Sequence, residues 1–140
     1  MKHFRILFAL VVSALFITSC GSSDEADIKA VCQKQVDAIN SENIQDVLST
    51  LDETSPYFKS SEQIFTRIFE IFDLELTLDN VKINKVENGL AEVELTLTTK
   101  KKSGPEFSDN VAVSLNILKK TENGWKFVES RSKSMESLKK

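Results

Sequence analysis

The sequence predicts an α+β domain in which helices near the N-terminus pack on one face of an antiparallel sheet of about four to six strands. Three segments with helical spacing come first in the chain. From residue 74 onward the apolar side chains recur at every second position, which is the spacing of strands with one buried face. Short turn signals separate these later segments, so consecutive strands are expected to pair as hairpins.

Two helices are expected before residue 52. Asp24, Glu25 and Asp27 precede the first one, where the positive end of the helix dipole favours acidic side chains. Asn40-Ser41 ends this helix and can cap a second, shorter one that runs to Leu51. The apolar residues of the first helix follow the stripe of a helix with one buried side: Ile28, Val31, Cys32, Val36 and Ile39.

A third helix is expected to follow the loop around Pro56. Ser60 with Gln63 three residues later resembles a capping box, which places the start of the helix at Ser60. Its apolar residues cover a broad arc, so much of its surface is expected to be buried, either as core or as the wall of a ligand cavity. These residues are Ile64, Phe65, Ile68, Phe69, Ile71 and Phe72.

Strand patterns fill the rest of the chain. Asn88-Gly89 and Asn123-Gly124 are strong hairpin signals, and Ser103-Gly104-Pro105 marks another turn. The apolar row of residues 107–117 is expected to face the core, whereas Leu118 and Val128 fall off their rows and could form an exposed apolar face. Residues 133–140 are polar and lack periodicity, so they are expected to be a flexible tail.

The N-terminus has the layout of an export signal. Lys2 and Arg5 precede about a dozen apolar residues, too few to span a bilayer as a helix. Thr18-Ser19-Cys20 then resembles the bacterial lipoprotein cleavage box. The resemblance implies a signal peptide over residues 1–19, an acylated Cys20 and a tether over residues 20–26. The alternatives are a secretory signal with a coincidental cysteine, or an uncleaved anchor.

Composition excludes several classes of function. Removal of residues 1–19 leaves 16 basic residues against 21 acidic ones, a net charge of −5, which argues against nucleic acid as a partner. Cys32 would then have no cysteine partner for an internal disulfide. The only histidine, His3, lies in the expected signal peptide. Neither a histidine-based nucleophile pair, nor a metal site, nor a bound cofactor is therefore expected.

The order of these elements and the run Asn123-Gly124-Trp125-Lys126-Phe127-Val128 resemble the nuclear transport factor 2-like superfamily, in particular its small secreted and lipoprotein members. The likeness spans residues 26–131 and places the domain at residues 27–132. It implies a cystatin-like cone, in which a curved sheet wraps the helices and leaves a pocket at its open end. The superfamily contains isomerases, cyclases and dehydratases as well as non-catalytic binding domains, so it does not define the function.

Candidate site residues follow from this cone. Glu129 shares strand parity with Trp125 and Phe127, Asp109 shares it with Phe107, and Tyr57 lies in the loop before the third helix. A catalytic carboxyl near an apolar wall would have to come from Glu129 or Asp109, with Tyr57 at the rim. For Glu129 a simpler role than catalysis is an exposed ion pair with Arg131. The ligand-pocket candidates are Phe65, Phe69, Leu95, Trp125 and Phe127.

The sequence favours a membrane-anchored lipoprotein whose non-catalytic domain binds a small apolar ligand or an envelope protein, with a homodimer as a further option. The expected location is the bacterial cell envelope, outside the cytoplasm, on the outer membrane or on the outer face of the plasma membrane. The alternative function is a small isomerase or hydro-lyase that uses a pocket carboxylate. No nucleophile elbow, phosphate loop or cluster of metal ligands supports an enzyme.

Overall fold

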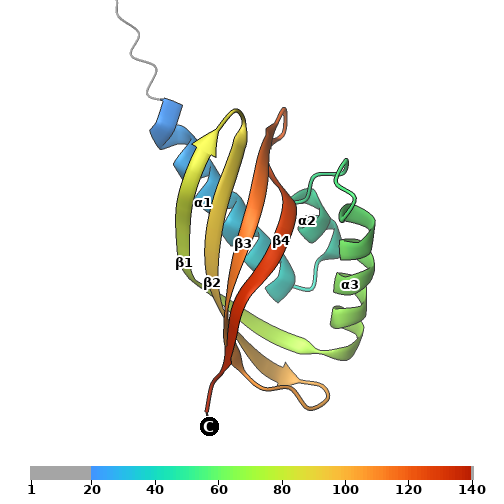
Figure 1. The fold of residues 1–140 in the computed structure, drawn as a ribbon. Helices are drawn as coiled ribbons and strands as arrows, with labels where there is room; N and C mark the ends of the chain where they lie inside the picture. The colour runs from blue at the N-terminus through green and yellow to red at the C-terminus, as the bar shows by residue number, and fades with distance from the viewer. Residues whose placement is uncertain (1–19, 140) are drawn as a thin grey trace, which may run out of the picture.

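The computed structural model describes residues 20–139 as three helices followed by four strands (Figure 1). The strands form one antiparallel sheet whose spatial order is the chain order, and α1 runs along its inner face. This arrangement confirms the predicted α+β class. The expected signal peptide lies outside the described residues. The elements are α1 Cys20–Asn40, α2 Ile44–Ser49, α3 Phe58–Ile71, β1 Asp73–Glu87, β2 Leu90–Ser103, β3 Asn110–Thr121 and β4 Gly124–Ser137.

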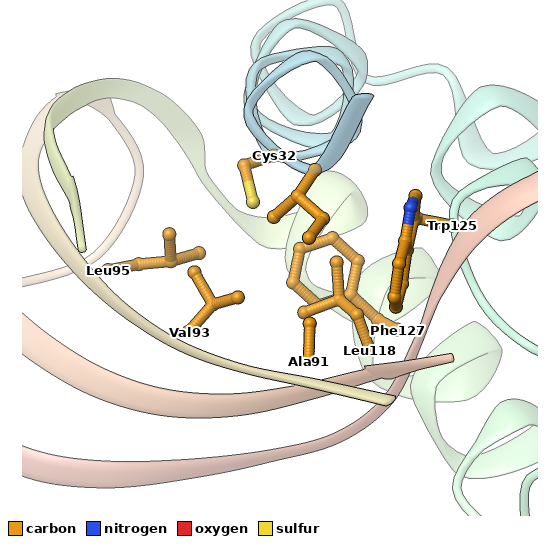
Figure 2. Close-up of a cluster of buried hydrophobic side chains, with 8 residues drawn as sticks. Cys32, Ala91, Val93, Leu95, Leu118, Trp125 and Phe127 are labelled. Carbon is orange, nitrogen blue, oxygen red and sulfur yellow. The ribbon is translucent and has the colours of Figure 1, made fainter. Parts of the chain in front are cut away.

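The main core lies between α1 and the sheet (Figure 2). Ile28 and Cys32 are four residues apart, so both side chains leave α1 on the side that faces the sheet. Burial raises the pKa of the Cys32 thiol to about 12, and this cysteine therefore packs as a small apolar residue. The buried cluster consists of Ile28, Cys32, Ala91, Val93, Leu95, Leu118, Trp125 and Phe127.

Strand β3 faces the opposite way from the prediction. Leu118 pairs with Ala91 on one side and with Phe127 on the other, and its side chain is fully buried. Its neighbours on the inner row are smaller or polar, among them Asn116. The expected core row was wrong because both faces of this strand carry apolar residues, so the turns and the pairing register decide which face is buried. The outer row is Val111, Val113, Leu115 and Ile117, all half-buried.

A β-bulge at Val128 changes the parity of β4. Phe127 pairs with Leu118, but the next paired residue is Glu129, opposite Ile117, so Val128 has no partner in the ladder. The side chain of Glu129 consequently lies on the outer row of the sheet, with that of Ile117. The prediction that Glu129 shares a face with Trp125 and Phe127 was wrong, because one extra residue reverses the alternation.

Both ends of the domain are more ordered than expected. Residues 20–26, predicted as a tether, are the first turns of α1. Residues 133–137, predicted as part of a flexible tail, continue β4, and Ser137 pairs with Asn110. Polar side chains suit residues 23–26 and 133–137 because nearly all of them are exposed, while main-chain hydrogen bonds supply the regular structure.

The helix starts also differ in detail from the prediction. The side chain of Asn43, not of Asn40 or Ser41, caps α2 by accepting a hydrogen bond from the Asp46 N–H. Helix α3 begins at Phe58, and the Ser60 hydroxyl donates to the Tyr57 carbonyl instead of capping the helix.

Helix α3 has no fully buried residue, although the sequence predicted a largely buried helix. Phe65 and Phe69 are partly buried and pack against a second, smaller core cluster of Ala38, Ile39 and Val47. Ile64 is exposed. The reason is that α3 lies at the side of the domain, next to a cavity, and not across the centre of the sheet.

Asp24 connects the start of α1 to the sheet. Its carboxylate accepts hydrogen bonds from Lys120 Nζ at 2.7 Å and from the indole Nε1 of Trp125 at 3.3 Å. The hydrogen bond from Lys120, helped by that from Trp125, lowers the pKa of Asp24 below its ordinary value. This carboxylate therefore contributes stability above the pKa that it has in the unfolded chain, and the contribution is lost as the pH falls through the folded-state pKa.

Substitution of Asp24 is therefore expected to have a pH-dependent effect. D24N should lower the Tm by a few degrees at neutral pH. The difference from wild type should disappear at an acid pH below the folded-state pKa, where the carboxyl is protonated in both states. The exposed neighbour in E25Q is the matched control and should leave the Tm unchanged at both pH values. A Tm loss that is equal at both pH values would show that Asp24 does not act through its charge.

Candidate functional site

A cavity of about 130 Å³ lies between α3, the loop after α2 and the inner side of β3 and β4. Apolar side chains, including Leu51, Phe65 and Phe127, form much of its wall. Polar side chains, including Gln35 and Asn116, complete the lining. The cavity therefore combines an apolar wall with a few polar groups, which is the usual composition of a small-molecule site.

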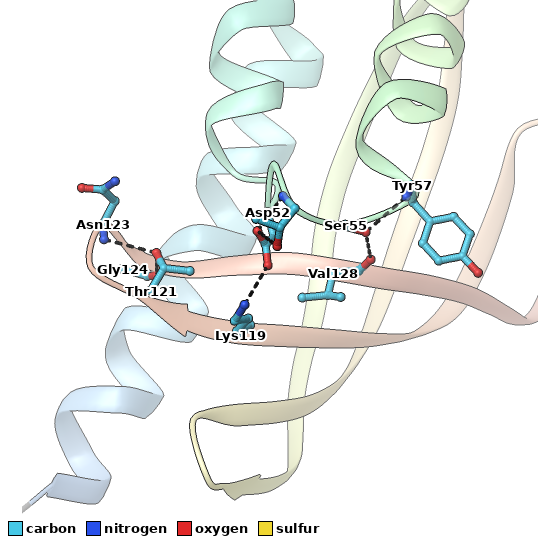
Figure 3. A network of polar contacts seen from close by, with 9 residues as sticks. Asp52, Ser55, Tyr57, Lys119, Thr121, Asn123, Gly124 and Val128 are labelled. Carbon is cyan, nitrogen blue, oxygen red and sulfur yellow. Dashed lines mark hydrogen bonds and ion pairs between the residues drawn. The ribbon is translucent and has the colours of Figure 1, made fainter.

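The loop after α2 is fixed to β4 by hydrogen bonds (Figure 3). The Asp52 N–H donates to the Phe127 carbonyl and the Phe127 N–H donates to the Thr50 carbonyl, both at 2.9 Å. The Ser55 hydroxyl donates to the Val128 carbonyl at 2.7 Å. The carbonyl of Val128, at the bulge, accepts a hydrogen bond from the loop, and these three hydrogen bonds hold this wall of the cavity in place.

Asp52 stabilises the loop internally. Its carboxylate accepts hydrogen bonds from the Thr54 N–H at 3.0 Å and from the Thr54 hydroxyl at 2.8 Å, and it lies 3.5 Å from Lys119 Nζ. The two hydrogen bonds from Thr54, with a smaller effect of Lys119, lower the pKa of Asp52. A carboxylate in this environment stays ionised at neutral pH and is a weak proton acceptor.

Asn116 presents an amide oxygen that no described residue uses. Its side chain is 3% exposed, and its Nδ2 donates to the Ser114 hydroxyl at 2.9 Å and to the Ser114 carbonyl at 3.3 Å. Since a carbonyl can only accept, this contact assigns the nitrogen end of the amide. Among residues 20–139, nothing donates to the Asn116 Oδ1.

Gln35 repeats this pattern on α1. The Thr50 hydroxyl donates its hydrogen to the Val47 carbonyl at 2.6 Å, so its oxygen is an acceptor for Gln35 Nε2 at 3.3 Å. The Gln35 Oε1 receives no hydrogen bond from the described part of the chain.

Asn116 and Gln35 were not predicted from the sequence. Asn116 lies two residues before Leu118, so both side chains point to the same face of β3. Had β3 been predicted to face the core with Leu118, a polar side chain on that face would have marked Asn116 as a candidate site residue.

The residues predicted from the sequence are divided between this cavity and other places. Phe65 and Phe127 line the cavity, and Tyr57 and Glu129 also border it. The Tyr57 side chain is 54% exposed, and Glu129 Oε1 pairs with Arg131 Nε at 3.0 Å. The remaining candidates, Phe69, Leu95, Trp125 and Asp109, do not line it.

Asp109 lies in the turn directly before β3, where it forms hydrogen bonds with the backbone of two other segments. Its carboxylate accepts a hydrogen bond from the Lys101 N–H at 2.9 Å, and its carbonyl accepts one from the Leu138 N–H at 2.7 Å. Asp109 and Glu129 therefore do not form a pair of carboxylates in one pocket. Over residues 20–139, three or more His, Cys, Asp or Glu side chains nowhere come together in a way that could hold a metal ion.

Comparison of the sequence with protein-family profiles shows the family of this chain. The sequence profile of the C-terminal domain of the anti-sigma-I factor RsgI9 matches residues 30–138. The chain belongs to that family. In this RsgI9 C-terminal family member, the matched range begins within α1 and continues through β4, so it includes the cavity and the whole sheet. No curated protein matches the sequence.

Solved structures show the same fold at low sequence identity. A candidate aromatic ring hydroxylase from Novosphingobium aromaticivorans has a TM-score of 0.70 at 16% identity, over 86% of this chain and 96% of that chain. A candidate dehydratase of the NTF2-like family from Streptomyces avermitilis has a TM-score of 0.68 at 14% identity, over 79% and 95%. A protein with a cystatin-like fold from Nostoc punctiforme has 0.65 at 14% identity, over 79% and 90%. The expected NTF2-like, cystatin-like fold of this RsgI9 C-terminal family member is thus confirmed, and the activities in those names stay with those proteins.

Among residues 20–139, no helix combines the length and the apolar character that crossing a bilayer requires.

Proposed function

We propose that this chain is a membrane-tethered, non-catalytic binding domain that holds a small, largely apolar ligand in the cavity beside α3. The observation that carries the proposal is the lining of the cavity, where the amide side chains of Asn116 and Gln35 stand beside an apolar wall that includes Phe65 and Phe127. An amide oxygen on the wall of a cavity can accept a hydrogen bond, so this lining suits a ligand that brings a donor. The Cys20 motif supports the tether, with lipid chains attached on the outer side of a bacterial membrane.

Size and polarity limit the ligand. A cavity of about 150 Å³ binds benzene in an engineered protein, and this one, at about 130 Å³, is similar. The ligand class is therefore one ring or a group of comparable size, with an apolar face toward Phe65 and Phe127. A hydroxyl or N–H on that ring would donate to Asn116 or Gln35.

Catalysis is less well supported than binding. An isomerase or hydro-lyase needs a carboxyl whose pKa is raised toward working pH by its surroundings. The carboxylate that is most deeply buried in the cavity wall, Asp52, has its pKa moved in the opposite direction by Thr54. Glu129 is ion-paired with Arg131 on the outer row of the sheet. The names of the structural neighbours raise the possibility of a dehydratase, but no group in this cavity favours it.

The proposal predicts that phenol binds more tightly than toluene. The two probes have similar size, but only phenol can donate to an amide oxygen. N116L removes the acceptor and keeps the branching and the number of non-hydrogen atoms of the side chain, so it should weaken phenol binding by about tenfold, the value of one hydrogen bond of roughly 1.4 kcal/mol. The same change should leave toluene binding almost unaltered. Dissociation constants from NMR titration of the purified domain would test this.

The matched control is N84L, in which the asparagine lies on β1, away from the cavity, and bonds to Glu92. It should bind both probes like wild type. The Tm of N116L should be recorded first, because Asn116 also bonds to Ser114. If wild type binds neither probe, or if N116L binds phenol as wild type does, the proposed ligand site is wrong.

A further inference from the structure

We propose that the turn between β1 and β2 contacts the bilayer that holds the acylated Cys20, with Val86 and Leu90 as the contacting side chains. The inference rests on the proposed lipid anchor and adds an orientation to it. It concerns three features that meet at one end of the domain: the start of α1, the Asn88-Gly89 turn and the end of β3.

Lys120 joins these three features. Its N–H donates to the Gly89 carbonyl at 2.8 Å, while its Nζ donates to the Asp24 carboxylate at 2.7 Å. Figure 1 shows the start of α1 and the β1–β2 turn at the same end of the molecule, opposite the C-terminus. The hairpin turn is thus held beside the first turns of the helix that begins at Cys20.

The distance from the lipid attachment point is short. Helix α1 begins at Cys20, four residues before Asp24, and at 1.5 Å per residue this separation is about 6 Å along the helix axis. Because the connection is helical and Asp24 is fixed to Lys120 and Trp125, the domain has little freedom to rotate away from the anchor. An acylated Cys20 at the bilayer surface would therefore bring the β1–β2 turn to the same surface.

The turn carries exposed apolar side chains on both of its sides. Val86 is 39% exposed and Leu90 is 47% exposed. Val86 pairs with Ala91 on the inner row, and Leu90 pairs with Glu87 on the outer row, so the two side chains leave the hairpin in opposite directions. A hairpin tip with apolar groups on both sides can enter the boundary between headgroups and acyl chains, whereas a solvated tip would gain from polar residues there.

The charges near this end do not favour anionic lipid in particular. Lys85 is paired with Glu87 at 2.5 Å, Lys119 with Asp52 at 3.5 Å and Lys120 with Asp24 at 2.7 Å. These lysines are therefore already neutralised within the protein, and attraction to a negative surface should be small. The occupant that fits is the apolar boundary of any bilayer, so the contact should not depend on lipid charge.

Fluorescence quenching would test the orientation. The full chain, exported and lipidated in a bacterial host, would carry E87C or E106C and the fluorophore NBD on the new thiol. E106C is the matched control, because Glu106 is an exposed glutamate in the β2–β3 turn, at the other end of the sheet. Cys32 is fully buried, and protein without a new cysteine gives the labelling background.

The proteins would be reconstituted in phosphatidylcholine vesicles that contain a lipid with a nitroxide on its headgroup. A probe on residue 87 would lie at the headgroup layer, roughly 5–10 Å deep at most, and should lose about half of its emission. A probe on residue 106 should keep its emission. The loss at residue 87 should persist when phosphatidylglycerol is added to the vesicles, because the contact is apolar.

A double variant separates contact from mere proximity. V86S with L90S, in the E87C background, should abolish most of the quenching while the protein still floats with the vesicles. Equal quenching at residues 87 and 106, or unchanged quenching in the double variant, would overturn the inference while the lipid anchor stands. If the protein does not float with the vesicles at all, the anchor is wrong and the orientation is wrong with it.

Discussion

Replacement of Leu118 by alanine is expected to lower the free energy of unfolding by about 2–5 kcal/mol, the range for a large apolar side chain removed from a packed core. Leu118 is fully buried between Ala91 and Phe127, and its loss would leave a void beneath α1. The adjacent change I117A should cost less than about 1 kcal/mol, because Ile117 is a half-buried residue on the outer row. Urea denaturation followed by the fluorescence of Trp125 would measure both values.

This pair of variants tests the direction in which β3 faces. The apolar row of residues 107–117 favours Ile117 as the core residue, and the structure has Leu118 there instead. A domain of this size has a total stability of about 5–15 kcal/mol, so L118A could be partly unfolded without denaturant. L118M keeps most of the volume and should cost less than about 1.5 kcal/mol. A larger loss for I117A than for L118A would contradict the register of this strand.

Replacement of Cys20 by serine is expected to move the protein from the membrane fraction to the soluble fraction. Each buried methylene is worth about 0.8 kcal/mol, and two or more acyl chains hold a protein on a bilayer durably, whereas one holds it only marginally. A serine at this position cannot form the thioether that carries the lipid. Cell fractionation with detection of the tagged protein would show the change as a nearly complete redistribution.

The other cysteine is the matched control. C32A changes a buried thiol on α1 and should leave the protein in the membrane fraction. The intact mass of the purified native protein gives an independent check, since a lipoprotein begins at Cys20 and carries the added mass of its lipid. A C20S protein that stays on the membrane, or a native mass that includes the leader, would exclude the lipid anchor.

The element order could be predicted because local signals agree with the fold. The helical stripe that includes Ile28 and Cys32 marks the face of α1 that is buried. Asn88 and Gly89 have φ angles of 53° and 72°, the positive values that a tight hairpin turn needs and that these two residue types tolerate. These signals depend only on residues that are close in the sequence, so they can be recognised without knowing how the rest of the chain folds.

The candidate site could be predicted only in part, because it depends on register. The bulge at Val128 reverses the direction of Glu129, and nothing in the local sequence marks the extra residue. Asn116 was overlooked for a related reason: it becomes an inner residue only when Leu118 is buried. Phe65 and Phe127 line the cavity, because Phe65 lies on a helix and Phe127 comes before the bulge, so the extra residue affects neither of them. Whether they bind a ligand stays a prediction.

The strands of the sheet lie side by side in the order in which they occur in the chain, and this has a consequence for a polypeptide that emerges with its N-terminus first. Each strand after β1 pairs with the strand that was synthesised just before it. However, Phe127 and Ser130, which line the cavity, belong to β4, the last strand. The helices and the β1–β2 hairpin can therefore fold while the cavity still lacks the wall that β4 provides. The cavity can therefore be completed only after β4 has been synthesised and has paired with β3.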